Sequence, residues 1–158
     1  MLSNPDLKAL QPFLKAGKTP VIIANDLDWI EGANASEQLE ALESEKQRLQ
    51  ATMEDWRKAW VSQDTDAYLN YYSKKFFYDD GGFEKWAEYK RGIQASKPKV
   101  SIQIEDVSMF AYPATKQPVI VVNFEQNFKS SNLQNKMRKR QYWMFDDNQW
   151  KIIYEGVA

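Results

Sequence analysis

Two hydrophobic periods divide the chain near residue 99. Before that point, apolar residues recur at spacings of three and four, which is typical of helices. After it they alternate with polar residues, as Val100, Ile102 and Ile104 do, which is typical of half-buried strands. Helices followed by a meander of strands predict an α+β fold, in which a curved antiparallel sheet wraps around N-terminal helices.

Local signals set the limits of these elements. Asn34 is the expected N-cap of a long helix, because Glu37 three residues later completes a capping box. Asp64 is the expected cap of a short helix. The predicted helices are residues 5–14, 34–60, 65–72 and 83–95, and the predicted strands are 19–24, 76–78, 100–105, 119–128, 137–145 and 150–154.

The composition excludes several kinds of chemistry. The chain has no cysteine and no histidine, so it offers no thiol nucleophile, no disulfide, no thiolate or imidazole metal ligand and no histidine base. Neither a metal site nor a cofactor is expected. With a formal net charge of -1, the chain has no global field that would attract nucleic acid. The basic residues 136–140 lie on a strand with alternating faces, which favours pairing with Glu105 and Glu125 over nucleic-acid binding.

The sequence also carries no membrane or export signal. No apolar run approaches the roughly 20 residues that span a bilayer. The first residues lack the charged and apolar regions of a signal peptide. The residues themselves therefore predict no membrane insertion.

From about residue 50 to 156, the order of elements and a set of aromatic and polar residues resemble the nuclear-transport-factor-2-like (SnoaL-like) fold. The resemblance is to the subfamily appended to bacterial L,D-transpeptidase-like proteins, and it implies a cone-shaped pocket domain. The residues that carry it are Trp56, Trp60, Asp64–Leu69, Tyr72, Phe76, Trp86, Phe124–Ser130, Lys139 and Trp150–Ile152.

The N-terminal segments Leu2–Leu10 and Gly17–Ile23 resemble the tail of an L,D-transpeptidase catalytic domain. This resemblance implies three parts: residues 1–33 as a remnant of that domain, 34–50 as a linker helix and 51–158 as the pocket domain. In the family, the nucleophilic Cys and its His precede this stretch, so no catalysis is expected from this chain. The first residues lack an Arg that many members carry, which leaves transpeptidase and carboxypeptidase parents both open.

The resemblance implies a non-catalytic accessory role in the periplasm or cell envelope. The domain would bind or position a peptidoglycan fragment for the adjacent catalytic domain, or mediate self-association as a homodimer. Aromatic rings would stack on sugars, and Arg or Lys would bind a carboxylate. The candidate pocket residues are Tyr68, Tyr72, Trp86, Lys90, Asn123, Glu125, Asn127, Arg138, Arg140 and Tyr142.

Three other interpretations stay open. The aromatic residues could be ordinary core and the charges ordinary surface. A ketosteroid-isomerase-like enzyme would use Asp80 as the base that abstracts a carbon-bound proton. A dimer would use Trp143 and Phe145 if both were exposed on the outer face of the sheet.

Overall fold

The structure is a computed structural model that describes residues 3–15, 19, 21–22, 32–78, 81–96, 99–113 and 115–158. Contacts between residues divide the chain into two compact units. The first unit is Met1–Ala35 and the second is Ser36–Ala158.

Among its described residues, the first unit starts with a short α-helix and a 3-10 turn. Helix α1 (Asn4–Leu10) starts with a capping box, in which Ser3 and Asp6 exchange hydrogen bonds between side chain and backbone, and η1 (Gln11–Phe13) follows it. The predicted helix 5–14 is thus confirmed, apart from its last turn. Neither Val21 nor Ile22 lies in a strand, and most of the predicted strand 19–24 falls outside the described residues.

Helix α2 (Ala33–Val61) is the longest element of the chain. It begins one residue before Asn34, directly after Gly32, whose positive φ of 70° suits a glycine before a helix. The prediction of Asn34 as N-cap is therefore wrong. Leu39 is 65% exposed, whereas Leu49 is fully buried, so α2 enters the core only in its second half.

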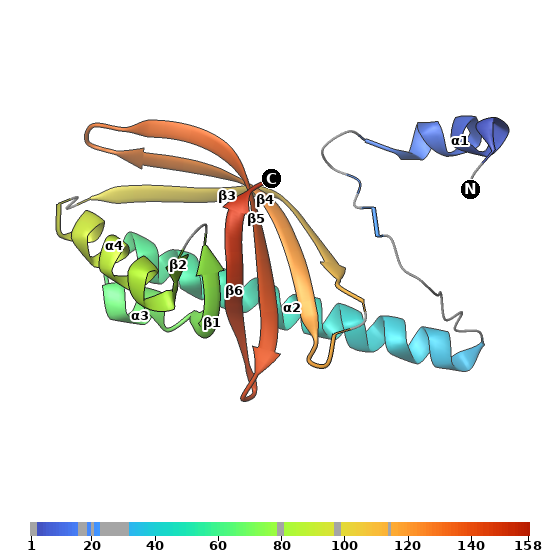
Figure 1. The fold of residues 1–158 in the computed structure, drawn as a ribbon, viewed down its shortest axis with the longest axis horizontal. Helices are drawn as coiled ribbons and strands as arrows, with labels where there is room; N and C mark the ends of the chain where they lie inside the picture. The colour runs from blue at the N-terminus through green and yellow to red at the C-terminus, as the bar shows by residue number, and fades with distance from the viewer. Residues whose placement is uncertain are drawn as a thin grey trace. The chain divides into compact units, whose positions relative to one another are not determined.

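Two shorter helices complete the helical layer. Asp64 caps α3 (Thr65–Leu69) as predicted, because its carboxylate accepts a hydrogen bond from the Ala67 amide at 2.9 Å. Helix α4 (Phe83–Ser96) follows the strands β1 (Tyr72–Tyr78) and β2 (Gly81–Gly82). Figure 1 shows α2, α3 and α4 together on one side of the sheet.

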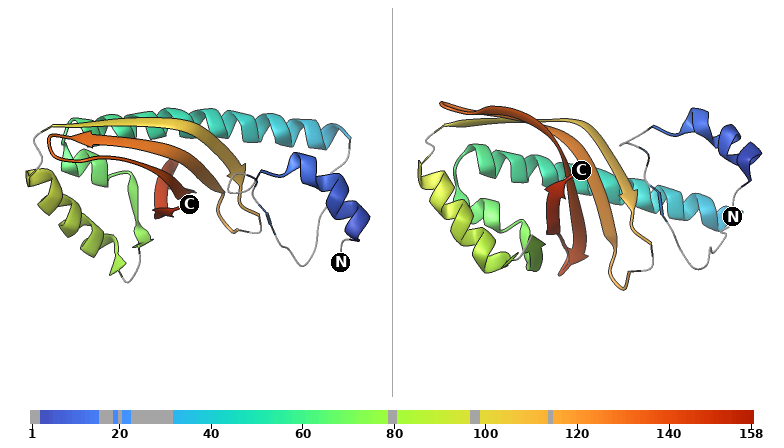
Figure 2. Two further views of the ribbon diagram at one scale, coloured as in Figure 1. Left: turned by 90° about the horizontal axis from the view of Figure 1, so that it is seen from above. Right: turned by 45° about the horizontal axis from the view of Figure 1, so that its top comes forward.

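The sheet has six strands in the order β2-β1-β6-β5-β4-β3. All neighbours are antiparallel except β1 and β6, which run parallel. Two views in Figure 2 show the long strands curving over α2, so the predicted fold class is confirmed. The long strands are β3 (Val100–Ala111), β4 (Val119–Ser130), β5 (Gln134–Asp146) and β6 (Gln149–Val157).

The face of the sheet that packs on the helices, called the inner face here, carries an aromatic core. Trp56 of α2 lies at its centre, with ring centroids 5.5 Å from Trp60, 6.1 Å from Tyr68 and 6.5 Å from Trp143. Trp143 is fully buried. The prediction that Trp143 is exposed is therefore wrong, because the alternation of β5 places it beside Gln141 and opposite Ile152. Phe145 is only partly buried and packs on Trp150 at 5.2 Å.

Candidate functional site

The candidate site is a cavity of about 190 Å³ between the inner face of the sheet and the helices. Helix α4 contributes a buried row at four-residue spacing, Trp86, Lys90 and Gln94, because residues i and i+4 share one face of a helix. Of this row, Lys90 and Gln94 line the cavity. The lining also includes Trp60, Gln63, Gln126, Phe128, Asn135, Lys139 and Glu155.

A bulge in β6 brings Glu155 to the inner face. In the ladder with β5, Tyr154 pairs with Tyr142 and Ile152 pairs with Trp143, so Ile153 is one extra residue on β6. An extra residue in one strand reverses the faces of the side chains that follow it. Glu155 is therefore buried, with 1% exposure, while Tyr154 turns to the outer face.

Glu155 is the centre of a polar cluster. One carboxylate oxygen accepts hydrogen bonds from Gln141 Nε2 at 2.8 Å and from the Tyr72 hydroxyl at 3.0 Å. The other lies 3.4 Å from Lys139 Nζ. The Tyr72 hydroxyl is also 2.5 Å from that of Tyr68, so the cluster extends from β5 and β6 to α3. Every buried charge in this cluster has a partner, as a folded protein requires.

These contacts decide the charge state of the cluster. Burial raises the pKa of Glu155, but Lys139, Lys90 and the hydrogen bonds from Gln141 and Tyr72 outweigh it, and the pKa lies below its ordinary value. Burial, and after it the charge of Glu155, raises the pKa of both Tyr68 and Tyr72 well above the ordinary value. At neutral pH, Glu155 is therefore ionised and both phenols are protonated.

Lys90 is a buried cation at an aromatic wall of the cavity. Its ammonium nitrogen lies 4.4 Å from the ring centroid of Trp86, 4.7 Å from that of Trp60 and 5.5 Å from that of Tyr68. Such contacts stabilise a cation that is removed from water. With Lys139 and Glu155, Lys90 gives the described lining two positive charges and one negative charge.

Four carboxamide groups in the cavity wall each have one buried polar atom without a hydrogen-bond partner among the described residues. Buried polar atoms are nearly always paired, so four unpaired ones around one cavity mark a place prepared for a polar ligand or water. The atoms are Gln63 Oε1, Gln94 Nε2, Gln126 Oε1 and Asn135 Oδ1.

Four of the ten predicted site residues lie at or just behind this cavity. Lys90 lines it, and Tyr68, Tyr72 and Trp86 form the layer behind it through the contacts given above. The sequence prediction missed Glu155, Lys139 and Gln126. Strict alternation after Trp150 and Ile152 would have placed Tyr154 inside and Glu155 outside. Because the sequence gives no sign of the bulge, it could not predict that Glu155 faces the cavity.

The other six predicted residues share the opposite, outer face of the sheet. On β4 and β5 they pair in the ladder, Asn123 opposite Arg140 and Glu125 opposite Arg138, with Asn127 opposite Lys136 and Tyr142 next along β5. The outer face therefore separates them from the inner cavity. As ligand contacts, all ten residues remain predictions.

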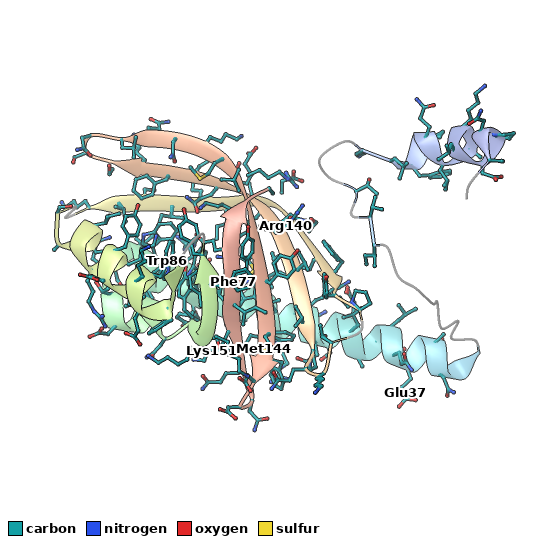
Figure 3. All side chains as sticks on the ribbon, in the orientation of Figure 1. Glu37, Phe77, Trp86, Arg140, Met144 and Lys151 are labelled. Atoms are coloured by element: carbon teal, nitrogen blue, oxygen red, sulfur yellow. The ribbon has the colours of Figure 1, made fainter. Side chains whose placement is uncertain are left out.

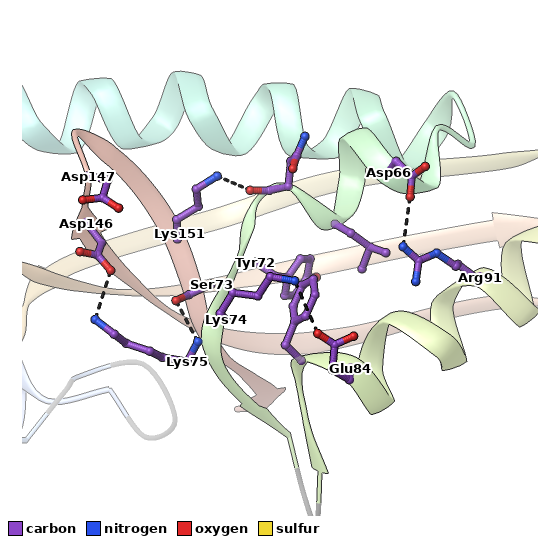
Figure 4. A pocket seen from close by; sticks show the side chains of 13 residues that line it. Asp66, Tyr72, Ser73, Lys74, Lys75, Glu84, Arg91, Asp146, Asp147 and Lys151 are labelled. Carbon is purple, nitrogen blue, oxygen red and sulfur yellow. Dashed lines mark hydrogen bonds and ion pairs between the residues drawn. The ribbon is translucent and has the colours of Figure 1, made fainter.

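A second hollow, of about 640 Å³, lies at the surface between β1, α4 and the β5–β6 turn (Figure 4). Most of its charges are already paired: Lys75 with Asp146 at 3.2 Å, Lys74 with Glu84 at 3.5 Å and Arg91 with Asp66 at 3.2 Å. Exposed pairs of this kind contribute little and compete with a charged ligand. The inner cavity, with its unpaired amides, is the better candidate.

In the described part of the chain, no three His, Cys, Asp or Glu residues group into a metal site. Within the same residues, no helix combines the length and apolar character needed to cross a bilayer. Asp80, the base expected for an isomerase, lies outside the described residues.

The curved sheet, the helical layer and the polar cavity between them define an α+β pocket domain of the NTF2-like type. The chain belongs to the family of Cds6 C-terminal NTF2-like domains, whose sequence model matches residues 48–156. No curated protein matches the chain.

Solved structures agree with this family. The chain is similar to Bd1075 of Bdellovibrio bacteriovorus, with a TM-score of 0.74 and 20% identity over 99% of this chain and 53% of that one. It is also similar to the helical cell shape determining protein Pgp2 from Campylobacter jejuni, with a TM-score of 0.59 and 27% identity over 66% of this chain and 38% of that one. The chain thus spans about half or less of the length of these two proteins.

A third similarity is to a protein from Parabacteroides distasonis that is described only as a putative ketosteroid isomerase, with a TM-score of 0.53 and 19% identity over 66% of this chain and 81% of that one. At this identity, the match concerns the fold alone. It therefore adds nothing for or against the isomerase interpretation.

Proposed function

We propose that this domain is a non-catalytic accessory module of a peptidoglycan-modifying protein of the L,D-transpeptidase or carboxypeptidase kind, acting in the periplasm or cell envelope. Its role is to bind cell-wall substrate in the inner cavity and position it for the catalytic domain. The observation that carries the proposal is the set of four unpartnered carboxamide atoms around that cavity.

The cavity of about 190 Å³ has room for one end group of a peptidoglycan fragment, and its chemistry suits either a sugar or the end of a stem peptide. Sugar hydroxyls and peptide amides both donate and accept hydrogen bonds, as free carboxamides require. The rings of Trp60 and Phe128 in the wall, 6.1 Å apart, offer apolar contact to the face of a sugar. The net positive lining suits the carboxylates of a stem peptide.

The charge state of Glu155 favours binding over proton transfer. A general base works best with a pKa near the operating pH, whereas the pKa of Glu155 is held low by Lys139 and Lys90 despite its burial. The carboxylate is also engaged by Gln141 and Tyr72. Its arrangement therefore supports a structural and electrostatic role in a binding pocket.

The similarity to Pgp2 supports the biological setting, because that protein is described as determining helical cell shape. Self-association has less support. Its predicted interface needed Trp143 on the surface, and Trp143 is fully buried.

The test is a titration of the full chain with muropeptides that carry both sugar and stem peptide, followed by tryptophan fluorescence, since Trp60 lines the cavity. Gln126→Leu keeps the volume and removes one free amide, so we expect its Kd to rise about tenfold, equivalent to roughly 1.4 kcal/mol. Gln103→Leu on the exposed side of β3 is the matched control and should bind as the unmodified chain does.

Two outcomes would contradict the proposal. A flat titration at millimolar muropeptide would remove the binding role. Saturable binding that Gln126→Leu leaves unchanged would move the site away from this cavity.

A further inference from the structure

A separate hollow of about 210 Å³ lies on the outer face of the sheet. Its lining consists of Arg140 with apolar and aromatic side chains from β1, β5 and β6: Phe77, Tyr142, Ile153, Tyr154 and Val157. Figure 3 labels Phe77 on β1 and Arg140 on β5, two strands that β6 separates in the sheet. The hollow therefore sits over β6, on the face opposite the inner cavity.

The aromatic walls of this hollow are held by contacts with each other. The ring centroid of Tyr154 lies 5.1 Å from that of Phe77 and 5.4 Å from that of Tyr142, and Tyr112 continues the row 5.8 Å beyond Tyr142. The row crosses the convex side of the sheet. Phe77 is 55% exposed, so part of this apolar surface faces solvent.

Gly156 forms the floor beneath Tyr154. A Cβ atom at this position would lie 2.9 Å from Tyr154 Cζ and closer still to the hydroxyl oxygen. The Tyr154 ring therefore lies down over the backbone of β6 only because residue 156 has no side chain. This close approach shapes the hollow.

Arg140 differs in its partner from the two neighbouring cations of β5, Lys136 and Arg138. Arg138 pairs with Asp106 at 2.8 Å, and Lys136 pairs with Glu125. Arg140 instead donates its Nε–H to the neutral amide oxygen of Asn123 at 2.8 Å. Among the described residues, no carboxylate pairs with its guanidinium, and none lines the hollow.

We propose that this hollow binds a small organic carboxylate, with Arg140 on the carboxylate and with Tyr142, Tyr154 and Phe77 against an apolar or planar group next to it. Asn123 fixes Arg140 through Nε and leaves the two terminal nitrogens, which form the bidentate fork that carboxylates accept. Contact with apolar walls strengthens such a pair, because the local dielectric constant is lower than in water.

The size of the hollow sets the size of the group bound. Sites that enclose a drug-sized ligand measure about 300–1,000 Å³, so a hollow of about 210 Å³ takes an end group. The free C-terminal residue of a peptide and an acidic sugar both supply a carboxylate beside such a group. This site is independent of the inner cavity and of the function proposed for it.

The experiment uses ¹⁵N-labelled full chain and follows backbone amide shifts during titration. The probes are N-acetylphenylalanine and N-acetylmuramic acid, each beside its uncharged counterpart, N-acetylphenylalaninamide and N-acetylglucosamine. We expect saturable shifts at residues 140, 142, 153, 154 and 157 with at least one acid, and at least tenfold weaker binding of its uncharged counterpart at these residues. Shifts at Gln94 and Gln126 report binding in the inner cavity and are fitted separately. Which acid binds tells the peptide source from the sugar source.

Three variants test the geometry. Arg140→Gln should lose at least tenfold in affinity, whereas Arg138→Gln, two residues along the same face, should bind as the unmodified chain does. Gly156→Ala keeps the charge but displaces Tyr154, so it should weaken binding while leaving the dispersed spectrum of a folded chain. The proposal is overturned if neither acid gives a saturable shift at millimolar concentration and a 20-fold molar excess over the protein. It is also overturned if the uncharged probes bind equally well in the outer hollow, or if Arg140→Gln leaves the affinity unchanged. Shifts that arise from a dimer, as seen by sedimentation, would overturn it as well.

Discussion

The buried charge of Glu155 makes a sharp prediction about stability. Glu155→Gln preserves the shape of the side chain and a hydrogen-bonding group, but it removes the negative charge that faces Lys139 Nζ at 3.4 Å. Lys139 would then lose the carboxylate beside its ammonium group, and the charge of Lys90, which helps to lower the pKa of Glu155, would no longer be balanced by that residue. A buried cation that loses its counter-charge is the costly case.

The expected magnitude follows from the distance. At an effective dielectric constant of about 20, unit charges 3.4 Å apart attract by roughly 5 kcal/mol. Part of that attraction only offsets the cost of removing the ions from water, so the free energy of unfolding should fall by about 3 kcal/mol. Glu125→Gln breaks the pair with Lys136 on the outer face, where Lys136 is 58% exposed, and should cost much less than Glu155→Gln.

The measurement is urea unfolding of the full chain, followed by circular dichroism. With a slope of about 2 kcal/mol per molar urea, Glu155→Gln should lower the midpoint by about 1.5 M and Glu125→Gln by less than 0.5 M. Adding Lys139→Met to Glu155→Gln should recover part of the loss, because the two positions interact directly. Equal midpoint shifts for the two single variants, or strictly additive effects in the double variant, would refute the reasoning.

Two further predictions concern acid and the cap of α3. The folded-state pKa of Glu155 lies below its ordinary value of 4.5, so its contribution to stability is complete above that pH and is lost as the pH falls through the lowered pKa. In urea unfolding series from pH 6 to 2, Glu155→Gln should therefore lose less stability with falling pH than the unmodified chain does. An unchanged dependence of stability on pH would contradict the assignment. Asp64→Ala removes the acceptor of the Ala67 amide, so it should lower the free energy of unfolding by about 1 kcal/mol in the same assay, whereas Asp64→Asn should lower it by less than half of that. Equal losses of stability for the two variants would argue against a capping role.

The sequence was sufficient for the fold because the decisive signals are local. Alternation in β4 separated Asn123, Glu125 and Asn127 from Phe124, Gln126 and Phe128, and the ladder confirms this division. Asp64 before an apolar helix was likewise readable as a cap. The start of α2 was misplaced, since the helix begins at Ala33, directly after Gly32 with its positive φ, and Asn34 lies inside it.

The site was less predictable because alternation says which side chains share a face, not which face encloses a cavity. Polar residues on both faces of β4 and β5 looked equally suitable for a pocket. The inner face turned out to carry Gln126, Lys139 and Gln141, held by the aromatic core, while the predicted Arg138 and Arg140 face outward. Only the packing of α4 against the sheet, which brings Lys90 and Gln94 to Gln126, distinguishes the two.

One inserted residue links the two candidate sites. Without the bulge at Ile153, Tyr154 would follow Ile152 into the core and Glu155 would turn to solvent. The inner cavity would then lose the carboxylate that balances Lys139, and the outer hollow would lose both the Tyr154 ring and the glycine floor beneath it. The bulge in β6 therefore determines which side chains both candidate sites receive. It places a charge inside, where lysines require one, and an aromatic ring outside, beside an arginine that has no carboxylate partner among the described residues.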